Sequence, residues 1–323
     1  MKQDTRNKAF LIGNGINRAI SNGVKSWEDL LGNLSKSFSV DIDLTNEFKP
    51  FPLSFEEILF KTHGNFDDNL KRIKTKIAKS FQDTPNNILH EKIMNSGVKH
   101  ILTTNYDYAF EKVLIPGFKN EIGQLPVSTR ETINSIRRRS IFKDKSLSVW
   151  HIHGEINDNK NFTSKDNYPS KSIMIGYEHY SEYIGEMQKY IRGEKMKEEK
   201  RLSEKLQEKE FEQTSWIDLF FTTDLVIAGL SFDFSEQHLW WLLNYRAKQK
   251  RRERKIIKNS IKYYYAVLPE VDPNDLNEFA KRQTKRKINK AKLDLFSSLG
   301  VEAIPIECNN YQEYFLKTFD KEI

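Results

Sequence analysis

Four short segments of this chain combine glycine, amide, carboxylate and histidine groups that can act on a ligand. They are residues 13–15, 103–107, 151–154 and 229–231. Backbone N–H groups of a glycine loop at the start of a helix can cradle a phosphate group. The side-chain amide of Asn105 can donate a hydrogen bond to a hydroxyl group or a water molecule and can also accept one. Histidine side chains ordinarily have a pKa of about 6.5, so an imidazole such as that of His153 can accept a proton near neutral pH.

Each segment taken alone also has a purely structural explanation. The two glycines of the first segment suit any tight turn, because glycine tolerates a positive φ. Asn105 and Asp107 are residue types that cap a helix after a strand, a role compatible with ligand contact. His151 lies two residues before His153 and therefore on the same predicted strand face, and we interpret it as a packed or supporting histidine. The four segments together are more informative than any one of them.

Short apolar runs lead into all four segments and predict buried strands. The runs cover residues 9–12, 99–104, 147–153 and 224–229, and two later strands are predicted over 261–268 and 301–306. Helical patterns lie between them, starting at Ser26 and over 106–113, 235–249 and 273–299. Strands that alternate with helices predict an α/β fold with a Rossmann-like, mostly parallel sheet. Because ligands bind at the carboxyl ends of the strands in such sheets, we expect the four segments to form one site.

We interpret residues 1–323 as a single domain of this fold with two helical insertions. The first insertion covers about residues 45–96, where Thr84-Pro85 predicts a helix start. The second covers about residues 157–215 and is mostly helical and rich in both charge signs. Such a composition is typical of a solvated helix, with an oligomer or partner contact as the alternative.

The composition excludes several classes of protein. The chain has 323 residues, with 52 Lys and Arg against 45 Asp and Glu, for a net charge of +7. No apolar run approaches the roughly 20 residues of a membrane span, and the first eight residues do not form a secretory signal, so we expect a cytoplasmic protein without membrane contact. Cys308 is the only cysteine, which excludes an internal disulfide and a zinc ribbon, and we predict no metal.

The first glycine loop does not fit the dinucleotide fingerprint of dehydrogenases. The third glycine of that fingerprint would fall at Arg18, and no acidic residue lies about 20 positions further on. A hydride-transfer enzyme is therefore disfavoured. Arg18 can pair with a phosphate, although an arginine near a helix start is as often a surface residue.

Other polar and aromatic side chains lie close to these segments in the sequence. Tyr177, His179 and Tyr180 follow a predicted strand at residue 176, and aromatic packing is favoured over a place in the wall of a ligand site. Asp233 and Glu236 open the predicted helix after residue 229, where carboxylates suit the helix dipole and can also bind a ribose.

In this order, the four segments resemble the motifs of the sirtuin superfamily. More narrowly, the chain is similar to the bacterial sirtuin-like branch linked to anti-phage defence, whose members cleave NAD. The resemblance covers the Rossmann-like core from about residue 9 to 306, but not the insertions. A chain with one cysteine lacks the four-cysteine zinc ribbon of sirtuin deacylases, so lysine deacylation is the less favoured activity.

The resemblance assigns roles residue by residue. Gly13, Asn14 and Gly15 match the Gly-Ala-Gly phosphate loop, with Asn14 in place of alanine, and Asn17 follows in the same motif. Asn105 and Asp107, with Thr104 beside them, match the Thr-Gln-Asn-x-Asp motif that contacts the nicotinamide ribose. His153 matches the catalytic histidine, and Gly229 and Ser231 match the Gly-x-Ser segment on the adenosine side. This implies that Asn105 and His153 are catalytic and that the other residues bind NAD.

The resemblance implies an NAD hydrolase that releases nicotinamide and ADP-ribose as the effector of a bacterial defence system, by depleting NAD in an abortive infection. Because uncontrolled NAD hydrolysis would kill the cell, we expect control through a homo-oligomer or a partner such as an ATPase or a nuclease. One alternative is a module that senses NAD or ADP-ribose without cleaving it.

Another alternative is a nucleic-acid-binding component of a defence complex. Two clusters of lysine and arginine, over residues 246–255 and 281–292, could neutralise phosphates. The aromatic residues near the first cluster are spaced as in a packed helix, and no nucleic-acid-binding motif is present. A solvated or partner-facing surface is therefore favoured.

Overall fold

The computed structural model describes residues 8–20, 26–44, 49–115, 136–156, 172–194, 200–208, 213–252, 256–269 and 276–323, of which 276–285 are described by their backbone alone. The first seven residues and parts of both predicted insertions lie outside these ranges. None of the described helices is long and apolar enough to cross a membrane.

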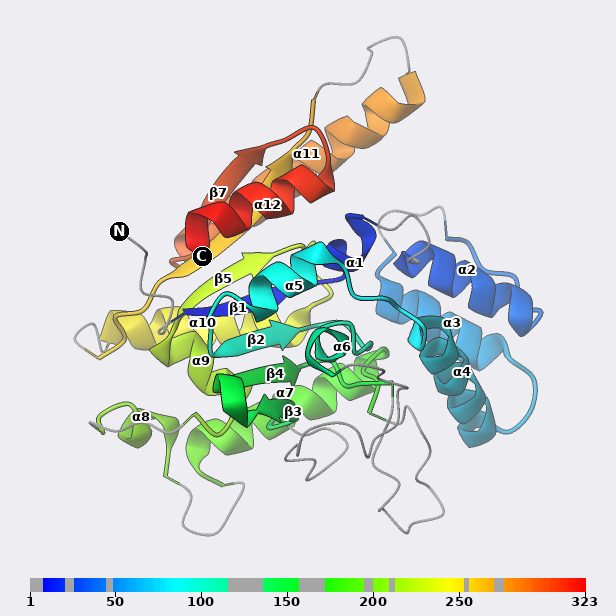
Figure 1. Ribbon diagram of the computed structural model, residues 1–323. Coiled ribbons are helices and arrows are strands. Elements are labelled where there is room, and N and C mark those ends of the chain that lie inside the picture. The colour runs from blue at the N-terminus through cyan, green and yellow to red at the C-terminus, as the bar shows by residue number, and fades with distance from the viewer. Residues whose placement is uncertain are drawn as a thin grey trace.

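A seven-stranded sheet forms the centre of the structure, and it confirms the predicted α/β fold (Figure 1). In chain order its strands are β1 (Lys8–Ile12), β2 (His100–Thr103), β3 (Arg139–Phe142), β4 (Leu147–His151), β5 (Asp224–Ala228), β6 (Ile261–Val267) and β7 (Glu302–Glu307). The order across the sheet is β3-β4-β2-β1-β5-β6-β7, and all neighbours are parallel except β3 and β4. The strand order reverses at β1, where ligand crevices of such sheets lie.

Alternate residues of β1 enter two different apolar cores. Ala9 and Leu11 pack with residues of α7 (Tyr177–Arg192), α9 (Trp216–Thr222), α10 (Gln237–Arg252) and α11 (Leu276–Ser298). Phe10 and Ile12 pack with residues of α1 (Gly15–Arg18), α5 (Ile88–Met94) and α12 (Tyr311–Glu322), next to the start of α6 (Glu111–Leu114). Both faces of the sheet are therefore covered, as continuous apolar strands require.

Three helices form a group of their own beside the carboxyl ends of the strands. They are α2 (Trp27–Ser37), α3 (Phe51–Lys61) and α4 (Phe66–Phe81), and they share a third apolar core with residues of the loops after β2 and β4. In Figure 1, β2 and β4 point toward the side of the molecule on which this group lies. As predicted, Ser26 begins α2, in a capping box with Asp29. The short α8 (Leu202–Lys205) lies on the opposite side.

Four local predictions differ from the structure. The predicted helix over 106–113 is only α6, because the Asp107 carboxylate accepts the Ala109 N–H and holds a turn before it. Helix α5 begins after Asn87 rather than at Thr84-Pro85, since the Asn87 side chain accepts two N–H groups of the first turn. No strand forms at residue 176; nearby, the Met174 N–H donates to the His153 carbonyl instead of extending the sheet. The short edge strand β3 was not predicted, because four residues with one charge give little pattern.

Candidate functional site

The glycines of the first segment allow two loops to touch. A Cβ atom on Gly13 would lie 2.6 Å from the Gly229 carbonyl oxygen, and one on Gly15 would lie 2.7 Å from the same atom. The N–H of Gly13 donates to the Ala228 carbonyl, and the N–H of Gly15 donates to the Gly229 carbonyl. These two N–H groups are occupied within the protein, so a phosphate bound here would need other donors.

The fourth segment, at Gly229, packs against the first segment, at Gly13. Gly229 adopts a φ of +65°, and a Cβ atom there would lie 2.3 Å from the Phe315 ring. Only glycine fits this position without a shift of the packed helix α12. Ser231 is exposed, and its carbonyl accepts a hydrogen bond of 2.6 Å from the ammonium group of Lys292. The buried side chain of Lys292 thus places a positive charge next to the loop after β5.

Asn17 and Asp107 join the first segment to the second. The Asn17 amide donates to the Asp107 carboxylate at 2.8 Å and to the Asn14 side chain at 3.0 Å. Burial raises the pKa of Asp107, while the hydrogen bonds from Ala109 and Asn17 oppose that shift. Thr104 donates its N–H to the Ile12 carbonyl, which ties the same two loops together. The Oδ1 atom of Asn17 is buried without a hydrogen-bond partner among the described residues.

Asn105 carries an unsatisfied amide in the middle of this arrangement. Its side chain is 5% exposed, and within the described structure neither Oδ1 nor Nδ2 has a hydrogen-bond partner. The backbone N–H of Asn105 donates to the Thr103 hydroxyl at 3.0 Å, which fixes the turn after β2. A buried amide without partners costs free energy, about 1–3 kcal/mol per group. A ligand or water that meets both atoms would remove that cost.

The strand register brings His153 next to this loop. Thr103 of β2 pairs with His151 of β4, so Asn105 and His153 both lie two residues beyond a paired position on neighbouring parallel strands. His153 is 2% exposed. Its Nε2 atom lies 3.2 Å from Nε2 of His238 and 3.2 Å from Oε2 of Glu236. The structure therefore groups two histidines and a carboxylate beside the asparagine.

Gly154 turns the chain so that His153 leaves the strand face that was predicted for it. Gly154 has a φ of +85°, and a Cβ atom there would lie 2.0 Å from the Ser172 carbonyl oxygen. His151, the last residue of β4, contacts α6 on one side of the sheet, whereas His153 contacts α10 on the other. The prediction that the two histidines share a face is wrong, because the strand ends at His151 and period-2 alternation ends with it.

His238 was missed by sequence reasoning. It lies on the first turn of α10, is fully buried, and its ring stacks on Tyr180 with centroids 5.3 Å apart. Burial, and then the neighbouring His153, lower the pKa of His238 well below its ordinary value. A single histidine in an apolar helix predicts core packing, and only the fold reveals that it faces His153. Glu236 also faces these histidines, so its place is not explained by the helix dipole alone.

His151 belongs to a separate buried ion pair. Its Nε2 atom lies 2.8 Å from the Glu111 carboxylate, and both side chains are inaccessible. Burial lowers the pKa of His151, but the Glu111 carboxylate outweighs this, and the pKa is raised above its ordinary value. His151 is therefore a buried residue that supports the turn after β2, which agrees with the packed or supporting role interpreted from the sequence.

The first turn of α7 contacts the group of helices α2, α3 and α4. The Tyr177 N–H donates to the Glu56 carboxylate at 3.1 Å, and the His179 ring lies 2.7 Å from the Lys74 ammonium group. Burial, and then Lys74, lower the pKa of His179 to about 3. Tyr180 packs against His153 and His238 and forms one wall of the site.

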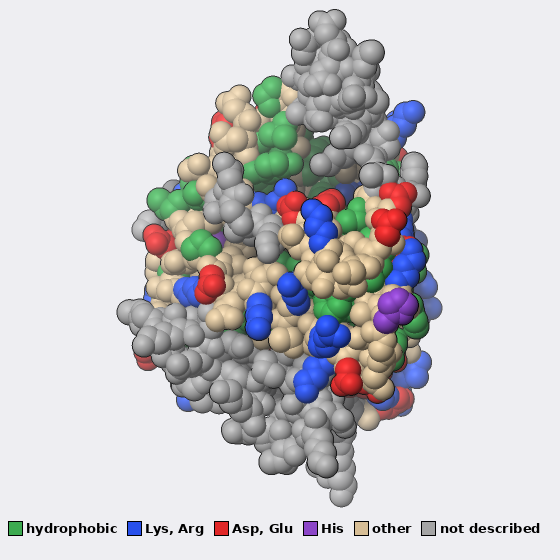
Figure 2. Space-filling model, turned by 90° about the vertical axis from the view of Figure 1, so that its right-hand side faces the viewer, with side chains coloured by type: hydrophobic (Ala, Val, Ile, Leu, Met, Phe, Trp, Pro, Cys, Tyr) green, Lys and Arg blue, Asp and Glu red, His purple; other side chains and the backbone are tan. Residues whose placement is uncertain are grey.

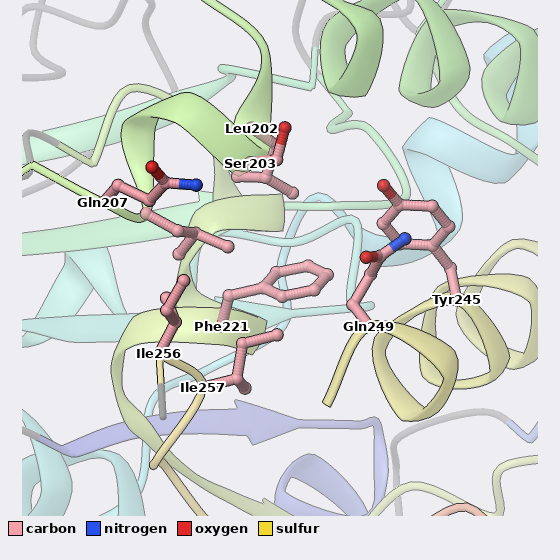
Figure 3. Close-up of a pocket in the computed structure, with 9 residues that line it drawn as sticks. Leu202, Ser203, Gln207, Phe221, Tyr245, Gln249, Ile256 and Ile257 are labelled. Atoms are coloured by element: carbon pink, nitrogen blue, oxygen red, sulfur yellow. The ribbon is translucent and has the colours of Figure 1, made fainter. Parts of the chain in front are cut away.

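A small apolar pocket lies elsewhere in the molecule. Figure 3 shows Phe221, Ile257 and Tyr245 among its lining residues, with α8 on one side and α10 on the other. Phe221 and Ile257 precede β5 and β6, so the pocket is at the amino ends of these strands. No residue predicted from the sequence for the site lines it, and Tyr245 is the one titratable side chain among its lining residues.

The structure reduces the case for nucleic-acid binding by the basic clusters. Arg246 of the first cluster is fully buried, where it donates to the carbonyls of Phe220 and Asn259. Lys292 of the second is buried against Ser231. Residues 281, 282 and 285 have no described side chains. Figure 2 shows another face of the molecule, on the side of α2, α3 and α4, where basic side chains lie among acidic ones.

One family model matches the chain, that of the SIR2-like domain, over residues 99–290. No curated protein matches it. The match runs from just before β2 into α11 and contains Asn105, His153 and the segment from Gly229 to Ser231, but not the loop at Gly13. It covers more than half of the chain, and its family uses NAD. The chain therefore belongs to the family of SIR2-like domain proteins.

Proposed function

We propose that this protein hydrolyses NAD to nicotinamide and ADP-ribose at the carboxyl ends of β1, β2 and β4. The observation that carries the proposal is the buried amide of Asn105, which has no hydrogen-bond partner among the described residues and follows the strand paired with the one that leads to His153. A SIR2-like family match supports NAD as the substrate. The residues of the surrounding loops would bind the dinucleotide or hold in place the loops that bind it: Gly13, Asn14, Gly15, Asn17, Thr104, Asp107, Gly229 and Ser231.

Asn105 would orient the ribose next to the nicotinamide. Its free Oδ1 and Nδ2 atoms suit a ribose hydroxyl group and a water molecule, because each of these both donates and accepts hydrogen bonds. Breaking the bond between ribose C1 and the nicotinamide nitrogen leaves the electron pair on the neutral nicotinamide and develops positive charge on the ribose. Holding the ribose in a fixed orientation lowers the barrier to that step.

His153 would accept the proton of the attacking water. The water oxygen bonds to ribose C1 as the water proton passes to an imidazole nitrogen, directly or through a ribose hydroxyl group. Nicotinamide leaves without a proton, so no general acid is required. Glu236, 3.2 Å from Nε2 of His153, would stabilise the imidazolium that forms.

The biological setting is a further part of this proposal. By its resemblance to defence-associated sirtuin-like proteins, the chain would act in the bacterial cytoplasm as the effector of an anti-phage system, as one domain with helical insertions. A homo-oligomer or a partner ATPase or nuclease would restrain it until infection. Light scattering tests the oligomer, and a monomer that is fully active alone would exclude this mode of control.

The decisive experiment is incubation of the purified protein with NAD, with nicotinamide and ADP-ribose followed by chromatography. We expect release by the wild type and loss of release in Asn105→Ala and His153→Ala. Asn33→Ala and His63→Ala, at exposed positions away from the site, are the matched controls. Equal release by all five proteins would exclude the assigned roles.

One observation favours a second candidate, a sensor that binds NAD or ADP-ribose without cleaving it. The Nε2 atom of His153 is engaged by His238 and Glu236, so this nitrogen is not free to accept a substrate proton in the described arrangement. Isothermal titration with NAD and ADP-ribose separates the two functions, because a sensor binds both without releasing nicotinamide.

A further inference from the structure

We propose that His153, Glu236 and His238 form a binding site for a divalent transition-metal ion of the Zn²⁺ class, and that the bound ion holds His153 in an inactive state. The sequence predicts no metal here, because the two histidines are 85 residues apart and come from different parts of the sheet. The fold brings their ring nitrogens and one carboxylate oxygen within 4.8 Å of one another.

The two distances from Nε2 of His153 to the other ligand atoms fit the coordination geometry of zinc. A tetrahedral Zn²⁺ ion with ligand bonds of about 2.0–2.1 Å holds neighbouring ligand atoms about 3.3 Å apart. The Nε2 atoms of His153 and His238 are 3.2 Å apart, and Nε2 of His153 is 3.2 Å from Oε2 of Glu236. Two imidazoles and a carboxylate are also the ligand set of catalytic zinc sites, which leave further positions open.

The ligand atoms have no better partners. Oε2 of Glu236 is buried and has no hydrogen bond among the described residues, although it lies close to His153. His238 sits in an aromatic enclosure formed by Tyr180, Tyr183 and Trp216, which fixes its ring. Its Nδ1 atom has no acceptor in the described structure, so packing orients the ring in place of the usual hydrogen bond to the far nitrogen.

A direct hydrogen bond between the imidazoles is the competing explanation. One Nε2–H would then donate to the other Nε2, which satisfies these two nitrogen atoms but leaves Oε2 of Glu236 without a donor among the described residues. A metal ion satisfies all three atoms at once, and the Glu236 carboxylate offsets part of its charge. The metal site is therefore the arrangement that accounts for the whole cluster.

The consequence for activity rests on the proposed function. While Nε2 of His153 binds a metal ion, that nitrogen cannot take a proton from water or ribose. Removal of the ion would leave this nitrogen only its contacts with His238 and Glu236, which it can exchange for a proton of water or ribose. The metal would thus restrain a hydrolase that is harmful to its own cell.

Titration of tag-free, chelator-treated protein with Co²⁺ tests the site without any substrate. We expect the visible absorption of protein-bound Co²⁺ to appear at one equivalent in the wild type and to be displaced by Zn²⁺. His238→Gln and Glu236→Gln should lose it, whereas His63→Gln, which removes an exposed histidine, should keep it. No absorption in the wild type, or the same absorption in all variants, would overturn the proposal.

X-ray absorption of the zinc-loaded wild type gives a test that does not depend on the folding of a variant. Two imidazole ligands and at least one oxygen ligand are expected. A spectrum with one imidazole or none would exclude the site.

Nicotinamide release at increasing Zn²⁺ tests the regulatory part. Release by the wild type should fall as Zn²⁺ saturates the site and return with a chelator, and His63→Gln should behave alike. Release that Zn²⁺ at saturation leaves unchanged would overturn the regulatory role. Metal binding by a protein that never cleaves NAD would sustain the site while removing the proposed function.

Discussion

Two histidines two residues apart meet opposite environments. His151 and His153 are equally buried, each 2% exposed. His151 contacts the Glu111 carboxylate at 2.8 Å, which raises its pKa and gives it a charge partner. His153 contacts another imidazole and Oε2 of Glu236, an atom that forms no hydrogen bond among the described residues. Burial alone does not distinguish the two histidines, whereas the kind of partner that each one contacts does.

The same contrast extends to the residues around them. Below the sheet ends, Tyr108 donates to Glu155 and Asn17 donates to Asp107, so each side chain has at least one partner, although Oδ1 of Asn17 has none among the described residues. Near His153, neither polar atom of the Asn105 side chain has a partner in the described part of the chain. Native proteins satisfy nearly all buried polar groups, so a cluster of exceptions indicates a place where a ligand completes the structure.

Substitution of His153 is expected to have the largest effect on activity. His153→Ala should lower nicotinamide release by about 10²–10⁴-fold, the usual contribution of a positioned proton acceptor. His151→Gln should lower it far less, because the His151 ring pairs with Glu111 and meets the Asn105 turn only at its backbone. Steady-state rates of the two folded variants test the comparison, and equal losses would contradict it.

Glu111→Gln is expected to have the largest effect on stability. It leaves His151 without its carboxylate inside the protein, and breaking such a buried pair costs about 3–5 kcal/mol. Denaturant unfolding measures the loss. Glu57→Gln, which breaks partly exposed ion pairs with Lys49 and Lys61, is the control and should change the free energy of unfolding by less than about 1 kcal/mol.

Much of the fold was predictable because its strands are continuous apolar runs. The predicted strands at 9–12, 224–229 and 261–268 agree with β1, β5 and β6 to within one residue at each end. The expectation that the polar segments meet at the strand ends follows from the same alternation of strands and helices. Propensity and periodicity are local properties, and they were sufficient for these elements.

The composition of the site was less predictable because it depends on long-range contacts. His238 lies on a helix that crosses to the site from the other half of the sheet, and no local pattern marks it. The turn at Gly154 changes which face His153 occupies. Likewise, the N–H groups of Gly13 and Gly15 are taken by backbone carbonyls near Gly229, a pairing that only the packed loops show.

Gly154→Ala should sharpen the comparison by moving His153 and leaving His151 in place. A left-handed φ costs a residue with a Cβ atom about 1–2 kcal/mol, and contact with the Ser172 carbonyl adds to it. We expect a loss of stability of about 2 kcal/mol with a disproportionate loss of nicotinamide release. Gly185→Ala, where an added Cβ atom meets nothing within 4 Å, is the matched control. Activity that falls only in proportion to the folded fraction would contradict this role of Gly154.

The smallest expected effect is on the pH dependence of stability, which should differ in sign between the two histidine environments. The pKa of His151 is raised, so its contribution is fully present below about pH 6.5 and is lost as pH rises through the raised pKa. Glu111→Gln should remove this loss of stability at rising pH.

The pKa of His238 is lowered. Below about pH 6.5 the unfolded protein therefore binds a proton that the folded protein does not, and stability falls as the pH is lowered. His238→Gln should remove up to about 1.4 kcal/mol per pH unit of that slope, measured by urea unfolding. Identical slopes for wild type and His238→Gln between pH 6.5 and 5 would mean that His238 is charged in the folded protein, and that its environment resembles that of His151.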